Sequence, residues 1–101
     1  MSWWTSLAIA VFGAASAVAQ LPEKTVVLTF DDAVKSHVDF VAPALKERGF
    51  GATFFISQLW MNDTANFLSW EDVAAINAMG FEIGNHTWTH LGVAGPKSAA
   101  L

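Results

Sequence analysis

Short apolar runs that recur along the chain constrain its fold more strongly than any other feature. Two of them are continuous, residues 25–30 (TVVLTF) and residues 52–57 (ATFFIS), and a shorter one covers residues 81–84 (FEIG). Continuous runs of β-branched, apolar and aromatic residues are typical of strands buried on both faces, as in parallel sheets. We therefore predict three strands of one parallel sheet.

Helical stretches separate these runs. The first is predicted over residues 38–48, where Pro43 should kink the helix or mark a late start. The second is predicted over residues 70–79, because Ser69 can serve as its N-cap and Asp72, three residues later, completes a capping box. The order strand, helix, strand, helix, strand predicts an α/β fold, a parallel β-α-β-α-β unit with two right-handed crossovers.

The N-terminus has the composition of a secretory signal. Residues 7–19 are apolar or small, and Ala17-Val18-Ala19 fits the small-x-small cleavage rule with the cut before Gln20. The run is shorter than the ~20 apolar residues that span a bilayer, although an uncleaved membrane anchor is the alternative. We therefore expect residues 1–19 to be a signal peptide and residues 20–101 to be secreted, periplasmic or in the cell envelope, with no stable membrane span after cleavage.

Charge and cysteine content exclude some functions. The chain has 9 acidic and 5 basic side chains, for a formal net charge of −4. This balance argues against a nucleic-acid partner, which would require a basic patch. The chain has no cysteine, so a disulfide framework and a thiolate metal site are both excluded.

Four side chains that can bind a metal or a proton follow the predicted strands. Asp31 and Asp32 come directly after the first strand, and His86 and His90 follow the third. The carboxyl ends of parallel strands meet at one edge of a sheet, so these residues should lie close together. Two imidazoles and one carboxylate make a three-ligand site for a divalent metal, and the second carboxylate can then act as a general base. Taken separately, the aspartates could form only a cap and a turn, and the histidines could be surface residues.

Other histidine and aromatic side chains have simpler interpretations. His37, near a predicted helix start, is expected to be solvated. Trp88 could stack on a sugar or pack in the interior. Four aromatic residues are predicted to lie in the core: Phe54, Phe55, Trp60 and Trp70.

The motifs TVVLTFDD, GFGATFFIS and GFEIGNHTWTH, within residues 24–93, together resemble the polysaccharide deacetylases, carbohydrate esterase family four. The resemblance implies a distorted (β/α) barrel, of which residues 20–101 would be the N-terminal part. It also implies a metal-dependent hydrolase that removes N-acetyl groups from chitin, peptidoglycan or exopolysaccharide, or in some members O-acetyl groups from xylan.

The resemblance also implies a role for each site residue. Asp31 matches the catalytic base, and Asp32, His86 and His90 match the metal ligands. The expected cofactor is one divalent metal, most often zinc, with cobalt or nickel in some members. The partner implied is an N-acetylated polysaccharide substrate.

Two departures from the family pattern bear on activity. Ala33 stands where the family usually has glycine, whose backbone is freer to adopt a tight turn. Family members also continue beyond the point that corresponds to Leu101, with an arginine motif, an acetyl pocket and a late histidine that acts as general acid. We therefore expect these 101 residues to be inactive alone.

Two other functions are compatible with the same residues. One is a non-catalytic metal-binding or glycan-binding remnant of a deacetylase. The other is a non-haem iron oxygenase, because two histidines and a carboxylate also suit Fe(II). The His-x-Asp spacing that such oxygenases normally use is absent from this sequence, which argues against that class.

Overall fold

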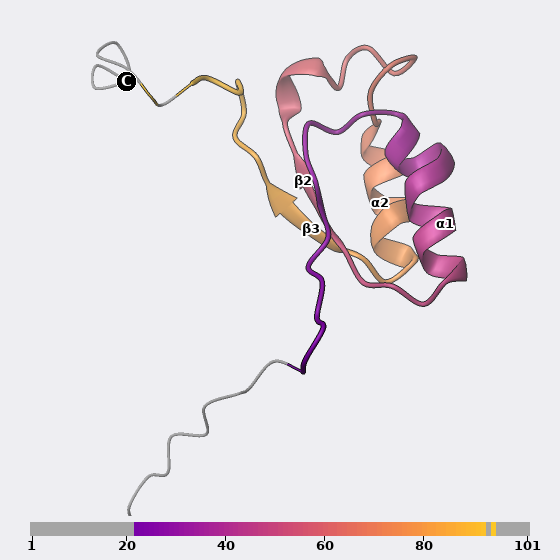
Figure 1. Cartoon of the computed structure of the whole chain (residues 1–101). Helices are drawn as coiled ribbons and strands as arrows, with labels where there is room; N and C mark the ends of the chain where they lie inside the picture. Colours follow the sequence, from indigo (N-terminus) through magenta and orange to yellow (C-terminus); the bar gives the residue numbers. More distant parts are fainter. Residues whose placement is uncertain (1–21, 93, 95–101) are drawn as a thin grey trace, which may run out of the picture.

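The computed structural model describes residues 22–92 and 94, and the predicted signal peptide, residues 1–19, lies outside this part (Figure 1). The elements, in chain order, are β1 (Thr29–Phe30), a π-helical turn (His37–Val41), α1 (Ala42–Glu47), β2 (Thr53–Ile56), a 3₁₀ turn (Gln58–Trp60), α2 (Trp70–Ala78) and β3 (Glu82–Asn85). The predicted alternation of strands and helices is confirmed.

The strands form one parallel sheet in the order β1-β2-β3, and α1 and α2 lie on the same side of it (Figure 1). Thr29 pairs with Thr53 in β2, and Thr53 in turn pairs with Glu82 in β3. All three strands therefore end at the same edge of the sheet. The α/β class with a parallel sheet is confirmed, and closure of such a sheet into a barrel stays a prediction.

The core lies between the sheet and the helices. Phe54 and Ile56 of β2 share one hydrophobic cluster with Val73 and Ile76 of α2. Phe54 is fully buried, and its ring stacks on that of Phe30 with 5.1 Å between ring centroids. Complete burial of side chains of this size stabilises a fold by about 1.5–3 kcal/mol each. This packing fixes β2 as the centre of the sheet.

The first strand is shorter than predicted. Only Thr29 and Phe30 pair with β2, whereas Val26 and Val27 are each 76% exposed. The ladder begins at Thr53, so the chain before residue 28 has no neighbouring strand. The prediction of a strand buried on both faces over residues 25–30 was therefore wrong for its N-terminal half.

A wide turn precedes the first helix. The Ala42 N–H donates to the carbonyl of His37, five residues earlier, and regular α-helix begins only at Ala42. Pro43 lies in the first turn of α1, and because the backbone before it is already helical, its missing N–H interrupts the hydrogen-bond pattern where the wide turn meets α1. The late start predicted from Pro43 is confirmed.

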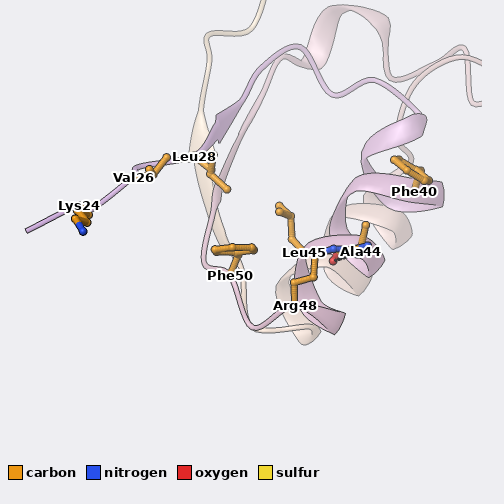
Figure 2. Close-up of a pocket in the computed structure, with 8 residues that line it drawn as sticks. All are labelled: Lys24, Val26, Leu28, Phe40, Ala44, Leu45, Arg48 and Phe50. Atoms are coloured by element: carbon orange, nitrogen blue, oxygen red, sulfur yellow. Dashed lines mark hydrogen bonds between the residues drawn. The ribbon is translucent and has the colours of Figure 1, made fainter.

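An apolar groove of about 710 Å³ lies between α1 and the chain that leads into β1 (Figure 2). Its lining includes Val26, Leu28, Phe40, Leu45 and Phe50. Val26 and Leu28 precede β1, and Phe50 precedes β2, so the groove opens near the amino ends of the strands. Among residues 22–92 and 94, no helix has the length and apolar character needed to cross a membrane.

Candidate metal centre

The two aspartates lie in a strained turn directly after β1. Asp32 has φ +73° and Ala33 has φ +58°, so two successive residues adopt the left-handed conformation. This conformation costs an L-residue about 1–2 kcal/mol, and glycine avoids most of the penalty. Ala33 is nevertheless fully buried in the core. The backbone thus adopts at Ala33 the geometry for which the family pattern has glycine.

Hydrogen bonds from the segment before α2 hold this turn in place. The Leu68 N–H donates to the Ala33 carbonyl at 2.8 Å, and the Lys35 N–H donates to the Asn66 carbonyl at 2.8 Å. Between these bonds, Val34 forms an antiparallel bridge with Phe67. The residues that follow Asp32 are therefore hydrogen-bonded to residues 66–68, which precede α2.

An ion pair reinforces the same attachment. The Lys35 ammonium lies 2.6 Å from Oδ2 of Asp72, and this oxygen also accepts a 2.8 Å hydrogen bond from the Ser69 N–H. Ser69 in turn accepts from the Asp72 N–H, which confirms the predicted capping box. The hydrogen bond from Lys35 lowers the pKa of the Asp72 carboxyl, and the same bond raises the pKa of Lys35.

His86 follows β3 and is fixed by the end of β2. Its N–H donates to the Ile56 carbonyl at 2.9 Å, and its own carbonyl accepts a 2.9 Å hydrogen bond from the Ser57 hydroxyl. Ser57 is fully buried. Ser57 was predicted only as part of a strand, although a hydroxyl at the end of an apolar strand is itself a signal that a partner is needed.

A compact loop returns the chain from His86 to His90. The Thr87 N–H donates to the Asn85 side-chain oxygen at 2.7 Å, and the His90 N–H donates to the Thr87 hydroxyl at 3.0 Å. Thr87 and His90 both have positive φ, +70° and +50°. These two turns bring the His90 side chain back towards the edge of the sheet.

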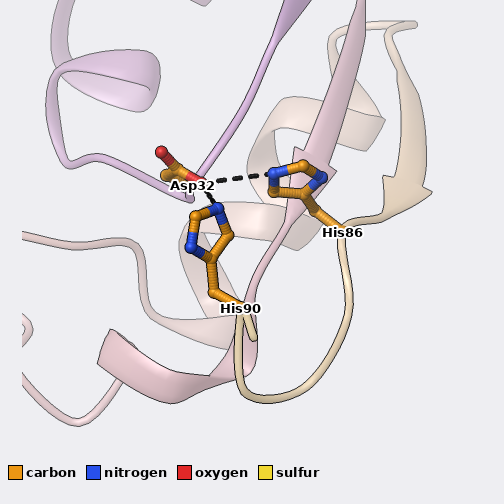
Figure 3. Close-up of side chains that lie close together, drawn as sticks. All are labelled: Asp32, His86 and His90. Carbon is orange, nitrogen blue, oxygen red and sulfur yellow. Dashed lines mark ion pairs between the residues drawn. The ribbon is translucent and has the colours of Figure 1, made fainter. Parts of the chain in front are cut away.

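The three predicted ligands converge in space (Figure 3). Oδ1 of Asp32 lies 3.4 Å from Nε2 of His86 and 3.1 Å from Nε2 of His90, and one ligand atom from each residue lies within 4.8 Å of the others. Oδ1 of Asp32 is buried yet accepts no hydrogen bond from residues 22–92 or 94. A buried oxygen that lies near two imidazole nitrogens without a hydrogen bond to either is well placed to bind one cation together with them. Two nitrogens and one carboxylate oxygen are also a donor set that suits zinc.

Asp31 and His37, the other two candidate residues, lie in different environments. Asp31 is exposed beside Asp32. His37 is buried against Phe30 and Phe54, with its Nδ1 unpartnered among the described residues, so the prediction that it is solvated was wrong. Burial lowers the pKa of His37, although the charges of Asp31 and Asp32 act in the opposite direction.

The four aromatic residues predicted to form the core have different environments. Phe54 is fully buried, whereas Phe55 and Trp60 are half-buried. Trp70, at the start of α2, is 58% exposed, so its assignment to the core was wrong. Trp88 is 71% exposed and therefore does not pack in the interior of the described part of the chain.

This chain is similar to known proteins in sequence and in structure. The polysaccharide deacetylase family model matches residues 19–99. Among solved structures, the Streptococcus pyogenes deacetylase PplD in complex with acetate is similar, with 27% sequence identity and a TM-score of 0.63. The match covers 77% of this chain and 36% of that one, so the chain spans about a third of the length of PplD in that structure. No curated protein sequence matches.

Proposed function

This chain belongs to the polysaccharide deacetylase family, and on that premise we propose that it carries the metal ligands and the general base of an exported enzyme that removes acetyl groups from an N-acetylated polysaccharide. The observation that carries the proposal is the convergence of Asp32, His86 and His90 at the carboxyl edge of the sheet. The exposed carboxylate of Asp31 lies next to Asp32 in the chain.

Asp32, His86 and His90 would hold one divalent cation, zinc by our proposal, with cobalt or nickel as substitutes. A bound cation of this kind lowers the pKa of water to about 7 and stabilises negative charge on a carbonyl oxygen. The buried Oδ1 of Asp32 would gain the partner that it lacks among the described residues. The hydrogen bonds to the backbone of His86 fix the position of that ligand before any cation binds.

Asp31 would act as the general base. Its side chain makes no hydrogen bond or ion pair with any residue among 22–92 and 94, so the carboxylate is free to accept a proton. In the proposed reaction Asp31 takes a proton from water as the water oxygen bonds to the acetyl carbonyl carbon. The carbon–nitrogen bond then breaks as the sugar nitrogen takes back the proton held by Asp31, which gives the free amine and acetic acid. The acid then passes its proton to the amine, and the products are acetate and a protonated amine on the sugar.

The proposed substrate is a polysaccharide, because the family model that matches the chain is that of the polysaccharide deacetylases. Within the described part of the chain, the side chains of Asp32, His86 and His90 are each between a third and a half exposed. Chitin, peptidoglycan and exopolysaccharide carry the required N-acetyl groups, and an O-acetylated xylan is the ester counterpart.

A second candidate is a non-catalytic remnant that binds a metal or a glycan. The observation that favours it is the three-ligand group itself, which would bind a cation whether or not turnover follows. Metal binding alone does not separate the two candidates, since both retain the same ligands.

The test measures the acetate released by the protein as its natural host produces it. The protein is loaded with zinc and supplied with N-acetylglucosamine oligomers or with acetylated xylan. We expect zinc-dependent release that is lost in Asp31→Asn, a variant that keeps the three ligands. Full metal occupancy with no acetate from either substrate would favour the remnant. Acetate release that is equal in wild type and in Asp32→Asn would contradict the proposed site.

A further inference from the structure

His90 has less backbone support than His86. His86 is held through both its N–H and its carbonyl by the end of β2, whereas the His90 N–H donates to the Thr87 hydroxyl within the same loop. The His90 side chain is 41% exposed, and its backbone is strained at φ +50°. An imidazole in such a loop needs a further contact to keep its Nε2 directed at Asp32.

Trp60 supplies that contact. Its indole lies against the imidazole of His90, with ring centroids 5.0 Å apart and an interplanar angle of 50°. Trp60 ends the 3₁₀ turn after β2 and is half-buried, but it is not part of the core cluster. The ring therefore packs on a ligand of the candidate metal centre instead of in the interior.

Trp60 is itself supported on its other side. Its ring stacks on Phe67 with 5.4 Å between centroids and an interplanar angle of 21°. Phe67 forms the bridge to Val34, two residues after Asp32. The contacts thus run from His90 through Trp60 and Phe67 to the turn that carries Asp32.

We propose that Trp60 is a positioning residue that holds the His90 imidazole in the orientation required for metal binding. The inference rests on the proposed function, because it assumes that His90 is a ligand. Trp60 does not reach the metal itself and acts only through the ring of His90. Outer contacts of metal-ligating histidines are typically worth about 10–100-fold in metal affinity.

The test is Co²⁺ binding to the full chain, measured by competition with a chelator and by visible absorption, which reports ligand geometry. Trp60→Leu should weaken Co²⁺ binding by about tenfold and change the absorption band. Trp60→Phe should restore both, because it keeps an aromatic face for His90. The matched control is Trp70→Leu, which removes an exposed tryptophan from the N-terminus of α2 and should bind as wild type.

The outcomes separate this inference from the proposed function. If wild type binds no Co²⁺ at a site sensitive to His86→Ala, the proposed site fails and this inference fails with it. If wild type binds and Trp60→Leu binds as tightly as Trp70→Leu, only the role of Trp60 is overturned. Should Trp60→Leu lose its circular dichroism signal, Trp60→Met replaces it. Loss of folding in both variants would show a structural role and overturn the proposal.

Discussion

The ring of Phe55 on β2 lies across Gly84, its partner on β3, so closely that a Cβ on Gly84 would come within 2.4 Å of the ring. Gly84 is the last residue but one of β3, just before the chain enters the His86 loop. The close approach of these two strands therefore depends on the missing side chain.

Gly84→Ala should destabilise the protein. The added methyl group must displace the Phe55 ring, and overpacking of this kind typically costs about 1–3 kcal/mol. The free energy of unfolding, measured by denaturant titration, should fall accordingly. In the Phe55→Leu background the same change should be less costly. Equal losses in both backgrounds would show that Phe55 is not the obstacle.

Removal of a single ligand should empty the metal centre. Asp32→Asn and His86→Ala each take away one of three donors, so each should weaken binding by more than the roughly 10–100-fold effect of losing an outer contact. Calorimetric titration with Zn²⁺ should show one site per chain in wild type. Glu71→Gln is the control, because this exposed carboxylate lies in the first turn of α2 and is not part of the three-ligand group. Metal content unchanged in His86→Ala would contradict the assignment.

The two adjacent aspartates should separate binding from turnover. In the protein as its natural host produces it, Asp31→Asn keeps the three ligands and loses the base, so Zn²⁺ affinity should remain while acetate release falls by about 10²–10⁴. Asp32→Asn should lose both. The measurements are Zn²⁺ titration and acetate release on the same preparations. Loss of metal in Asp31→Asn with retention in Asp32→Asn would reverse the two roles.

Burial of His37 should make stability depend on pH. Burial lowers its pKa below the unfolded value of 6.5, so the folded chain binds fewer protons than the unfolded chain in this window. The contribution of neutral His37 is therefore complete above pH 6.5 and is lost as pH falls towards the lowered pKa. His37→Leu keeps an apolar group in the site and removes the titration. The difference between the unfolding free energies of wild type and His37→Leu should shift against wild type on acidification, and a constant difference would contradict this interpretation.

The order of elements and the convergence of the three candidate ligands could be predicted because they depend on local patterns. Apolar runs locate strands, Ser69 and Asp72 locate the start of α2, and parallel order brings Asp32 and His86 to one edge. Each of these inferences needs only sequence spacing and the direction of the strands.

The features that could not be predicted depend on packing between distant segments. His37 is buried because Phe30 and Phe54 pack around it, and no periodicity marks that contact. The role of Trp60 depends on the irregular chain between β2 and α2, whose path follows from tertiary contacts. The length of β1 also depends on a distant segment, because β1 can pair only from the residue at which β2 begins.

The candidate metal centre draws its ligands from the ends of two strands that do not pair with each other. Asp32 follows β1 and His86 follows β3, while β2 lies between these strands. A bound cation would therefore act as a crosslink across the sheet, with about 2.7 kcal/mol of added stability when free metal is at a hundred times its Kd. Without metal, only β2 would connect β1 and β3 in the described part of the sheet. With metal bound, β1 or β3 could separate from β2 only if the cation dissociated. Amide hydrogen exchange in these two strands should therefore slow together.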